Sequence, residues 1–267
     1  MDRNPTLAAA LLASALLLSP TAFAQDAAKT DASQAAAATV EADDLLNATL
    51  WMQSAVEYKA NSLAVYALAK MILDADETAI DNSAYEAGLA VNHRDYSSKD
   101  WAEWTAAAEA KAVPGAVEYA KYADSKGVKV FYVTNRKAAE EEATRKNMEA
   151  LGFPMGGNVD TFLTRGEKEE WSSDKTSRRD FVGKDYRVLA LIGDNLGDFI
   201  EVDDDIEARA AAFDEVKDHF AQDWFMLANP TYGSWEPAAY GGNFKLSREE
   251  KRRMKMDALE SWVPGGQ

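Results

Sequence analysis

Apolar residues recur at roughly helical spacing in the part of the chain that begins near Asp43 and runs to Lys70. They are Leu46, Leu50, Met52, Val56, Tyr58, Leu63 and Tyr66, and their spacing predicts an amphipathic helix. Four short apolar runs rich in β-forming residues follow, at residues 71–73, 128–133, 188–192 and 224–227. The stretches between the first three runs are long enough for the crossover helices that parallel strands require. The pattern therefore predicts an α/β fold in which helices flank a mainly parallel central sheet.

The first three apolar runs end at polar or acidic residues. Asp74 follows the first run, Thr134 follows the second, and Asp194 lies just after the third. In a parallel α/β sheet, functional sites lie beyond the carboxyl ends of the strands. We therefore expect Asp74, Thr134 and Asp194 at one rim of the sheet.

The N-terminal residues differ from the rest of the chain. Residues 1–24 combine a basic start at Arg3, an apolar run over residues 7–18 and small residues at Ala22 and Ala24, which predicts a signal peptide cleaved before Gln25. The alternative is an uncleaved membrane anchor, which the shortness of the run disfavours. Residues 25–42 are rich in Ala, Ser, Thr and Asp and predict a flexible linker. The remaining residues, 43–267, are long enough for one sizeable core.

Charge and cysteine content narrow the partners and the compartment. The formal net charge of −16 disfavours binding to nucleic acid polymers and to anionic lipid. The absence of cysteine from the 267 residues removes disulfides, thiolate metal sites, cysteine nucleophiles and a lipid-acceptor cysteine after the leader. We expect a protein without a stable membrane anchor that is soluble in the periplasm or secreted.

Four short motifs carry the candidate chemistry: "LDADET" (73–78), "VFYVTNR" (130–136), "SDKTSRR" (173–179) and "LIGDNLGDF" (191–199). Taken singly, each is explained as well by a turn, a helix cap or a surface residue. A calcium loop starting at Asp74 fails because Ala79 and Tyr85 stand where glycine and glutamate are needed. The chain has only two histidines and lacks a GxSxG, Walker A or GxGxxG motif, which disfavours other hydrolase and nucleotide-binding chemistries. The order of the motifs raises their joint significance.

In that order the motifs resemble those of the haloacid dehalogenase (HAD) superfamily, and more narrowly the class C bacterial acid phosphatases related to the outer-membrane lipoprotein 5'-nucleotidase. The narrow resemblance extends from about residue 45 to the C-terminus. It rests on "LWMQSAVEY" (50–58), "LDADETAIDNSAY" (73–85), "PGAVEYAKYADSKGVKVFYVTNR" (114–136), "GDNLGDF" (193–199) and "NPTYGSWE" (229–236). Two departures are the missing lipid-bearing cysteine and Ala75, where the family usually has a larger aliphatic residue.

The resemblance implies a Rossmann-like HAD fold and a magnesium-dependent phosphomonoesterase. Asp74 would be the nucleophile that forms an aspartyl-phosphate, and Asp76 the general acid and then base. Thr134, the backbone N–H of Asn135 and Lys175 would hold the transferred phosphoryl oxygens. Mg²⁺ would bind the side chains of Asp74 and Asp194 and the backbone carbonyl of Asp76, with Asp198 holding a metal-bound water. Lys175 would also keep the clustered carboxylates ionised.

The substrate prediction concerns residues 84–113, which we interpret as a small helical cap inserted between the first two motifs. Trp101 from this cap and Tyr232 would stack on an aromatic leaving group such as a nucleobase, so that 5'-nucleotides are the implied substrates. The alternative is that Trp101 and its neighbour Trp104 pack one helical face against the core. The resemblance also implies a homodimer. The alternative function is a non-catalytic binding or storage protein that retains the HAD scaffold.

Overall fold

The computed structural model describes residues 45–68 and 73–262. The predicted signal peptide (1–24), the predicted linker (25–42) and two residues of the first apolar run, Met71 and Ile72, lie outside the described residues. Residues Asp44–Gln267 belong to one compact unit.

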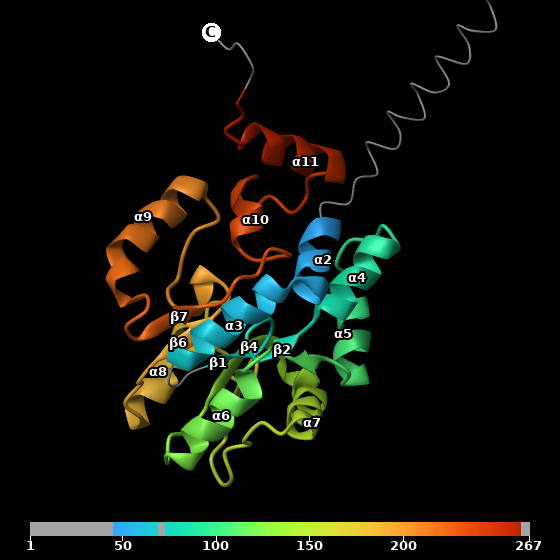
Figure 1. Ribbon diagram of the computed structural model, residues 1–267. Helices are drawn as coiled ribbons and strands as arrows, with labels where there is room; N and C mark the ends of the chain where they lie inside the picture. The colour runs from blue at the N-terminus through green and yellow to red at the C-terminus, as the bar shows by residue number, and fades with distance from the viewer. Residues whose placement is uncertain (1–44, 69–72, 263–267) are drawn as a thin grey trace, which may run out of the picture. The chain divides into compact units, whose positions relative to one another are not determined.

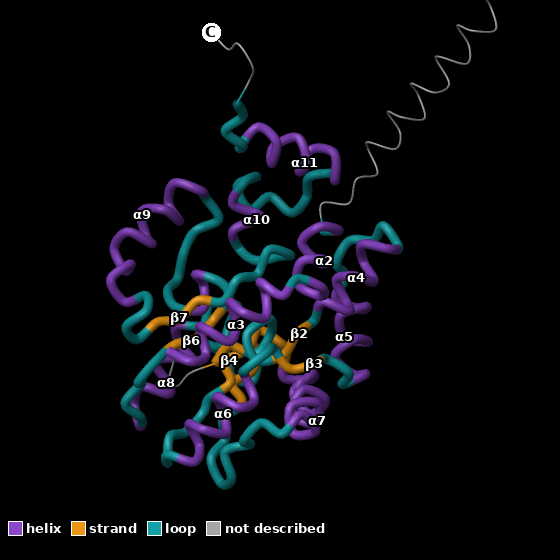
Figure 2. The backbone as a smooth tube through the Cα atoms, viewed as in Figure 1, coloured by secondary structure: helices purple, strands orange, loops and turns teal. Residues whose placement is uncertain are grey.

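A five-stranded sheet forms the centre of the unit (Figures 1 and 2), with strand order β5-β4-β1-β6-β7. The strands are β1 (Leu73–Asp74), β4 (Tyr132–Lys137), β5 (Phe162–Arg165), β6 (Leu191–Gly193) and β7 (Trp224–Met226). Each neighbouring pair is parallel. A separate antiparallel pair joins β2 (Ile80–Asp81) to β3 (Lys111–Ala112). The predicted mainly parallel sheet flanked by helices is confirmed.

Helices surround this sheet in Figure 1. The N-terminal half of the unit contributes α2 (Leu46–Ser54), α3 (Val56–Leu68), α4 (Ser83–Val91), α5 (Ser98–Ala107), α6 (Ala116–Ser125) and α7 (Glu141–Leu151). The C-terminal half contributes α8 (Thr176–Asp185), α9 (Ile206–Val216), α10 (Trp235–Ala238) and α11 (Arg248–Asp257). Short 3₁₀ turns lie at Ala138–Glu140, Leu196–Asp198 and Lys217–His219. Of the helices that the structure describes, none is both long and apolar enough to cross a membrane.

The two faces of the sheet bury two separate apolar clusters, because successive side chains of a strand point to opposite faces. One cluster contains Tyr132 and packs under α3 and α6. The other contains Phe131 and Val133 and packs under α8. The strands at the centre are thus buried on both sides, as expected for a parallel sheet covered by crossover helices.

The strand register fixes where the polar residues emerge. Leu73 of β1 lies opposite Tyr132 of β4 and Ile192 of β6, and Asp74 lies opposite Val133. The carboxyl ends of the three central strands therefore meet at one edge. Asp74 is at the middle of that edge, between the segments that carry Thr134 and Asp194.

The single helix predicted up to Lys70 is wrong: the described residues form two helices, α2 and α3, separated at Ala55. Ala55 has an extended backbone (ψ 131°) and ends α2. Met52 and Tyr58 are both 2% exposed. Six residues along one straight helix would leave these side chains about 120° apart, so the break at Ala55 helps to turn both toward the core.

Several predicted strand boundaries also differ from the structure. The second strand begins at Tyr132 rather than at residue 128, and the third covers Leu191–Gly193 rather than 188–192. The fourth, predicted at 224–227, is Trp224–Met226. The strand β5 was not predicted, because its four residues are too few to display a period and charged residues follow them.

The segment 84–113, predicted as a cap, holds most of α4, all of α5 and the strand β3. In Figure 1, α4 and α5 lie along one flank of the unit, beyond β2. The helix α4 packs against α2, and α5 packs against α7. The helices of the segment are therefore anchored to elements that come before and after it in the sequence.

Candidate active site

The segment after β1 folds back tightly on itself. The N–H groups of Ala79 and Ile80 donate to the carbonyl of Ala75, each at 2.9 Å, and the N–H of Glu77 donates to the carbonyl of Ile80. Glu77 adopts a left-handed backbone conformation, with φ of 55°. A non-glycine residue in this region costs about 1–3 kcal/mol, and such strain is concentrated at functional sites. The tight turn keeps Asp76 close to the rim on which Asp74 lies.

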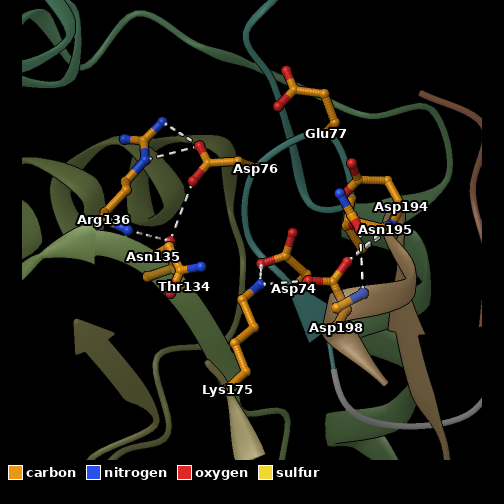
Figure 3. A network of polar contacts seen from close by, with 12 residues as sticks. Asp74, Asp76, Glu77, Thr134, Asn135, Arg136, Lys175, Asp194, Asn195 and Asp198 are labelled. Atoms are coloured by element: carbon orange, nitrogen blue, oxygen red, sulfur yellow. Dashed lines mark hydrogen bonds and ion pairs between the residues drawn. The ribbon is translucent and has the colours of Figure 1, made fainter. Parts of the chain in front are cut away.

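Three acidic side chains gather at this rim. Asp74, Asp194 and Asp198 each present a carboxylate oxygen, and these oxygens lie within 4.8 Å of one another. Lys175, which immediately precedes α8, donates to the carboxylate of Asp74 and, at 2.8 Å, to that of Asp198. Figure 3 shows the Lys175 ammonium between these two carboxylates. The structure thus brings together four residues predicted from three separate motifs.

Asp198 reaches the cluster because β6 ends in a glycine. Its Oδ2 accepts hydrogen bonds from the N–H groups of Asp194 at 3.1 Å and Asn195 at 2.9 Å. A Cβ atom at position 193 would lie 2.5 Å from the Asp198 side chain, so only glycine allows this approach. Asp198 therefore fixes the backbone that carries Asp194 and also shares the Lys175 ammonium.

Asp194 is held from two sides. The Thr78 hydroxyl donates to its Oδ1 at 3.1 Å, and the Asn229 amide donates to its Oδ2 at 2.9 Å. Thr78 belongs to the turn after β1, whereas Asn229 follows β7. The carboxylate of Asp194 therefore connects the segment after β1 to the segment after β7, the two strands that flank β6.

The pKa values of these groups describe a site with excess negative charge. Burial raises the pKa of Asp74 well above its usual range, and repulsion from Asp198 and Asp194 adds to the rise, against the attraction of Lys175. Burial and the charges of Asp198 and Glu77 raise the pKa of Asp194 to about 7. Although burial alone would lower it, the pKa of Lys175 is raised by Asp198 and Asp74. Lys175 opposes the rise in the pKa values of Asp74 and Asp194, and its role in keeping the clustered carboxylates ionised stays a prediction.

The cluster has the properties of a site for a hard divalent cation. Its donors are carboxylate oxygens, which Mg²⁺ prefers, and they are close enough to share one ion. The unbalanced charge inferred from the raised pKa values of Asp74 and Asp194 would be relieved by such an ion. The residues present therefore fit a Mg²⁺ site.

Asp76 does not join this cluster and instead faces an arginine. Arg136 from β4 donates to Oδ1 of Asp76 through Nε at 2.9 Å, and its Nη2 is ion-paired with the same oxygen at 2.8 Å. The Thr134 hydroxyl donates to Oδ2 at 3.2 Å. Burial opposes ionisation, but the charge and hydrogen bonds of Arg136 and a hydrogen bond from Asn82 hold the pKa of Asp76 below its usual value. The pKa of Asp74 is thus raised and that of Asp76 lowered, although both belong to the first motif. Such opposite shifts allow the two carboxyl groups to have different chemical roles.

Asn135 is fixed by contacts to the segment that carries Lys175. Its side-chain amide donates to the carbonyl of Ser173 at 2.9 Å, and its Oδ1 accepts from Arg178 at 2.6 Å. Arg178, on α8, is fully buried and also donates to the carbonyl of Thr134. Arg178 therefore ties the end of β4 to the start of α8, so that Thr134, Asn135 and Lys175 keep a fixed relative position.

Trp101 and Tyr232 reach the site through different partners. Trp101, on α5, lies edge-on to Tyr85 at 5.1 Å between ring centroids, and its own ring centroid is 5.4 Å from the guanidinium carbon of Arg136. The Tyr232 hydroxyl donates to the carboxylate of Glu77, which is 1% exposed. Each aromatic ring is thus connected to the turn that carries Asp76.

Sequence reasoning missed several residues of this network. They are Glu77, Asn82, Arg136, Arg178 and Asn229, all of which lie inside or beside the quoted motifs. The one signal available in the sequence is Arg136, which comes shortly after the apolar run of the second motif: an arginine buried there would need a partner for its charge. The sequence does not show which carboxylate that partner would be.

The comparisons with known proteins all find similarity to acid phosphatases, and each similarity covers most of the chain. The family model for HAD superfamily, subfamily IIIB (acid phosphatase), matches residues 18–235. The structure of the class C acid phosphatase from Bacillus anthracis is similar with 33% sequence identity and a TM-score of 0.76, over 82% of this chain and 98% of that one. The crystal structure of the class C acid phosphatase from the same organism with tungstate bound gives 34% identity and a TM-score of 0.77, over 84% and 100%.

Proposed function

The chain belongs to subfamily IIIB of the HAD superfamily, the acid phosphatases, and from this premise we propose that it hydrolyses phosphomonoesters through Asp74 in a Mg²⁺-dependent reaction. The observation that carries the proposal is the buried group of Asp74, Asp194, Asp198 and Lys175 at the end of the central strand. Family membership makes the enzyme a phosphoric monoester hydrolase and favours this reading over a non-catalytic protein on the same scaffold.

In the first step a carboxylate oxygen of Asp74 attacks phosphorus, and the bond from phosphorus to the leaving oxygen breaks. Asp76 gives its proton to the leaving oxygen, so that an alcohol departs and an aspartyl-phosphate remains. Because Arg136 holds the pKa of Asp76 low, the protonated form that gives this proton becomes abundant only in more acidic solution.

In the second step water attacks the same phosphorus and the Asp74–phosphorus bond breaks. Asp76, now a carboxylate, accepts the proton of that water and returns to its starting form. Asp74 is released as a carboxylate, and inorganic phosphate leaves. Asp76 thus serves both steps from one position.

Thr134, the backbone N–H of Asn135 and Lys175 hold the phosphoryl oxygens. These groups come from β4 and from the residue before α8, which Arg178 joins, so they need little rearrangement when substrate binds. A divalent cation held by the side chains of Asp74 and Asp194 and the carbonyl of Asp76 would supply positive charge to the phosphoryl group and the attacking carboxylate. Asp198 orients the backbone of Asp194 and would hold a water of that ion.

The proposed leaving group is flat and aromatic, as in a 5'-nucleotide. Trp101 and Tyr232 support this proposal because both are large aromatic side chains tied to the turn that carries Asp76. Stacking is worth about 1–3 kcal/mol per base and tolerates different bases. Segment 84–113 would act as the cap that contributes Trp101. The proposed substrates are therefore small-molecule phosphomonoesters, with 5'-nucleotides preferred.

Compartment and assembly belong to the same proposal. The pattern of residues 1–24 supports export to the periplasm or the medium. The family resemblance supports a homodimer, which light scattering of the purified protein at several concentrations would test. A constant monomer mass would contradict it.

The proposed function is tested with a panel of phosphate esters. We expect the purified protein to release phosphate at acidic pH, to lose activity in a chelator and to regain it with Mg²⁺. The Asp74→Asn variant should fold and remain inactive across the panel. Undiminished turnover by Asp74→Asn, or activity that survives removal of divalent ions, would contradict the proposal.

A further inference from the structure

The carboxyl group of Asp76 is held unequally at its two oxygens. Oδ1 accepts from Arg136 Nε at 2.9 Å and from the side-chain amide of Asn82 at 2.9 Å, and it is ion-paired with Arg136 Nη2 at 2.8 Å. Oδ2 accepts from the Thr134 hydroxyl at 3.2 Å. Among the described residues, two N–H groups therefore donate to Oδ1, which also lies against the guanidinium charge, and one hydroxyl donates to Oδ2.

This asymmetry determines which oxygen can exchange a proton. A carboxylate oxygen offers about two lone pairs, and two N–H groups already donate to Oδ1. A proton on Oδ1 would stand against these donors, one of which belongs to a cation. Oδ2 retains accepting capacity beyond the Thr134 hydroxyl, so a proton taken up by Asp76 resides there. Figure 3 shows that oxygen directed toward Thr134, one of the proposed phosphate-binding residues.

The guanidinium of Arg136 is itself held rigidly. The residue is 2% exposed, its Nη1 donates to the Thr144 hydroxyl at 3.1 Å, and its Nη2 also donates to Oδ1 of Asn82 at 3.0 Å. The ring of Trp101 lies against the guanidinium. Arginine offers its donors in a planar fork, so fixing the fork also fixes the carboxylate that it binds.

Asn82 links this arrangement to α5. Its Oδ1 accepts from the indole N–H of Trp104 at 2.8 Å, and its amide donates to both Asp76 and Glu77. Asn82 is fully buried. The carboxyl of Asp76 is therefore held by β4, by the turn after β2 and, through Trp104, by α5.

We propose that Arg136, assisted by Asn82, is the positioning residue of the acid–base step: it fixes Asp76 so that Oδ2 gives the proton to the leaving oxygen. The inference rests on the proposed function and names the atom that acts. In the first step the proton leaves Oδ2 for the departing oxygen as the phosphorus–oxygen bond breaks. In the second step Oδ2 receives the proton of the attacking water, and Asp74 is freed.

The test compares esters that need the acid with esters that do not. An alkyl leaving group such as that of glycerol phosphate must be protonated as it departs, whereas p-nitrophenolate departs readily without a proton. In Arg136→Met we expect kcat/KM, which reports the steps up to departure of the leaving group, to fall about 10- to 100-fold more on glycerol phosphate than on p-nitrophenyl phosphate. Arg145→Met is the matched control: Arg145 is also ion-paired through Nε and Nη2, to Glu141 and Asp160, and should change neither value.

The same substitution in an Asp76→Ala background distinguishes action through Asp76 from other roles. If Arg136 acts through Asp76, its removal should leave the ratio of the two rates unchanged in that background. Equal losses on both esters in the parent background would overturn the proposal, since they indicate a structural role. A selective loss of the same size with and without Asp76 would also overturn it, since Arg136 would then contact the leaving group itself.

Folding of the variants is checked by thermal unfolding, because Arg136 is buried. Should Arg136→Met not fold, Arg136→Lys keeps the charge but lacks the planar fork, and the same selective loss is expected. The outcome for Asp74→Asn separates the two proposals. Activity of that variant would contradict the proposed function, whereas equal losses in the Arg136 variants with an inactive Asp74→Asn would contradict only the positioning role.

Discussion

At the scale of single residues, the acidic side chains of the site have different surroundings, which shift their pKa values in opposite directions. Asp74 and Asp194 lie in a buried group with excess negative charge, and the pKa of each is raised. Asp76, two residues from Asp74, is paired with Arg136, and its pKa is lowered. The first environment favours binding of a cation, and the second keeps the carboxyl group of Asp76 ionised. Neighbouring residues of one motif thus acquire different roles from their partners.

The raised pKa of Asp194 has a consequence for stability in the metal-free protein. The folded value is about 7 and the ordinary value is 3.8, so the folded state binds more protons between these pH values. The contribution of this group to stability is therefore present below about 3.8 and is lost as the pH rises through about 7. In chelator, Asp194→Asn should gain thermal stability relative to the parent as the pH rises from about 4.5 to about 7.5.

Mg²⁺ should reverse this trend. The ion binds ionised carboxylates, so it should raise the Tm of the parent protein more at the higher pH and have little effect on Asp194→Asn. Thermal scans of both proteins at the two pH values, with chelator and with Mg²⁺, provide the measurement. A Tm difference between parent and variant that stays constant with pH would contradict the assignment of excess charge to Asp194.

At the scale of elements, the site depends on strand ends and on contacts between distant segments. The strand ends are readable from sequence: an apolar run followed by Asp74, and another followed by Asp194, mark carboxyl ends that a parallel sheet must bring together. Contacts such as Arg136 with Asp76 are not readable, because the partners are 60 residues apart and their meeting depends on strand register. The break at Ala55 and the strand β5 escaped prediction because each depends on packing rather than on a local pattern.

The helix α5 provides the test of substrate choice. If Trp101 and Tyr232 stack on a base, replacing either by Ala removes leaving-group contacts and leaves Asp74, Asp76 and Lys175 in place. By the stacking magnitude of about 1–3 kcal/mol, kcat/KM on a 5'-nucleotide should fall roughly 5- to 150-fold. Glycerol phosphate should be affected little.

Tyr232→Phe is the matched control, because it keeps the ring and removes only the hydroxyl that donates to Glu77. This variant should retain more of the nucleotide activity than Tyr232→Ala. Equal losses on the nucleotide and on glycerol phosphate in both Ala variants would show that the two rings support the fold and not the leaving group.

At the scale of the whole molecule, a strongly acidic chain must bind an anionic ester. The formal net charge is −16. Substrate attraction must therefore be local, and cations near the rim include Lys175, Arg136 and Arg178, each of which makes a buried hydrogen bond. The overall charge opposes association with nucleic acid polymers, and Lys175 is the cation that we propose to bind the phosphoryl group.

The predicted signal peptide implies that the whole protein is exported from the cytoplasm. Expressed with its own N-terminus in a bacterial host, the protein should be released with the periplasmic or secreted fraction and begin near Gln25. N-terminal sequencing of that fraction provides the measurement. Recovery of the protein in the membrane fraction with residues 1–24 intact would contradict cleavage.

The most direct measurement of the proposed reaction is the search for a phosphoryl group on Asp74. The protein is mixed with excess p-nitrophenyl phosphate and Mg²⁺, quenched in acid within one turnover and mapped by peptide mass. We expect one added phosphoryl group on the peptide that contains Asp74, and none in Asp74→Asn. A phosphoryl group on a different residue, or rapid turnover with no phosphorylated peptide at any quench time, would contradict Asp74 as the nucleophile.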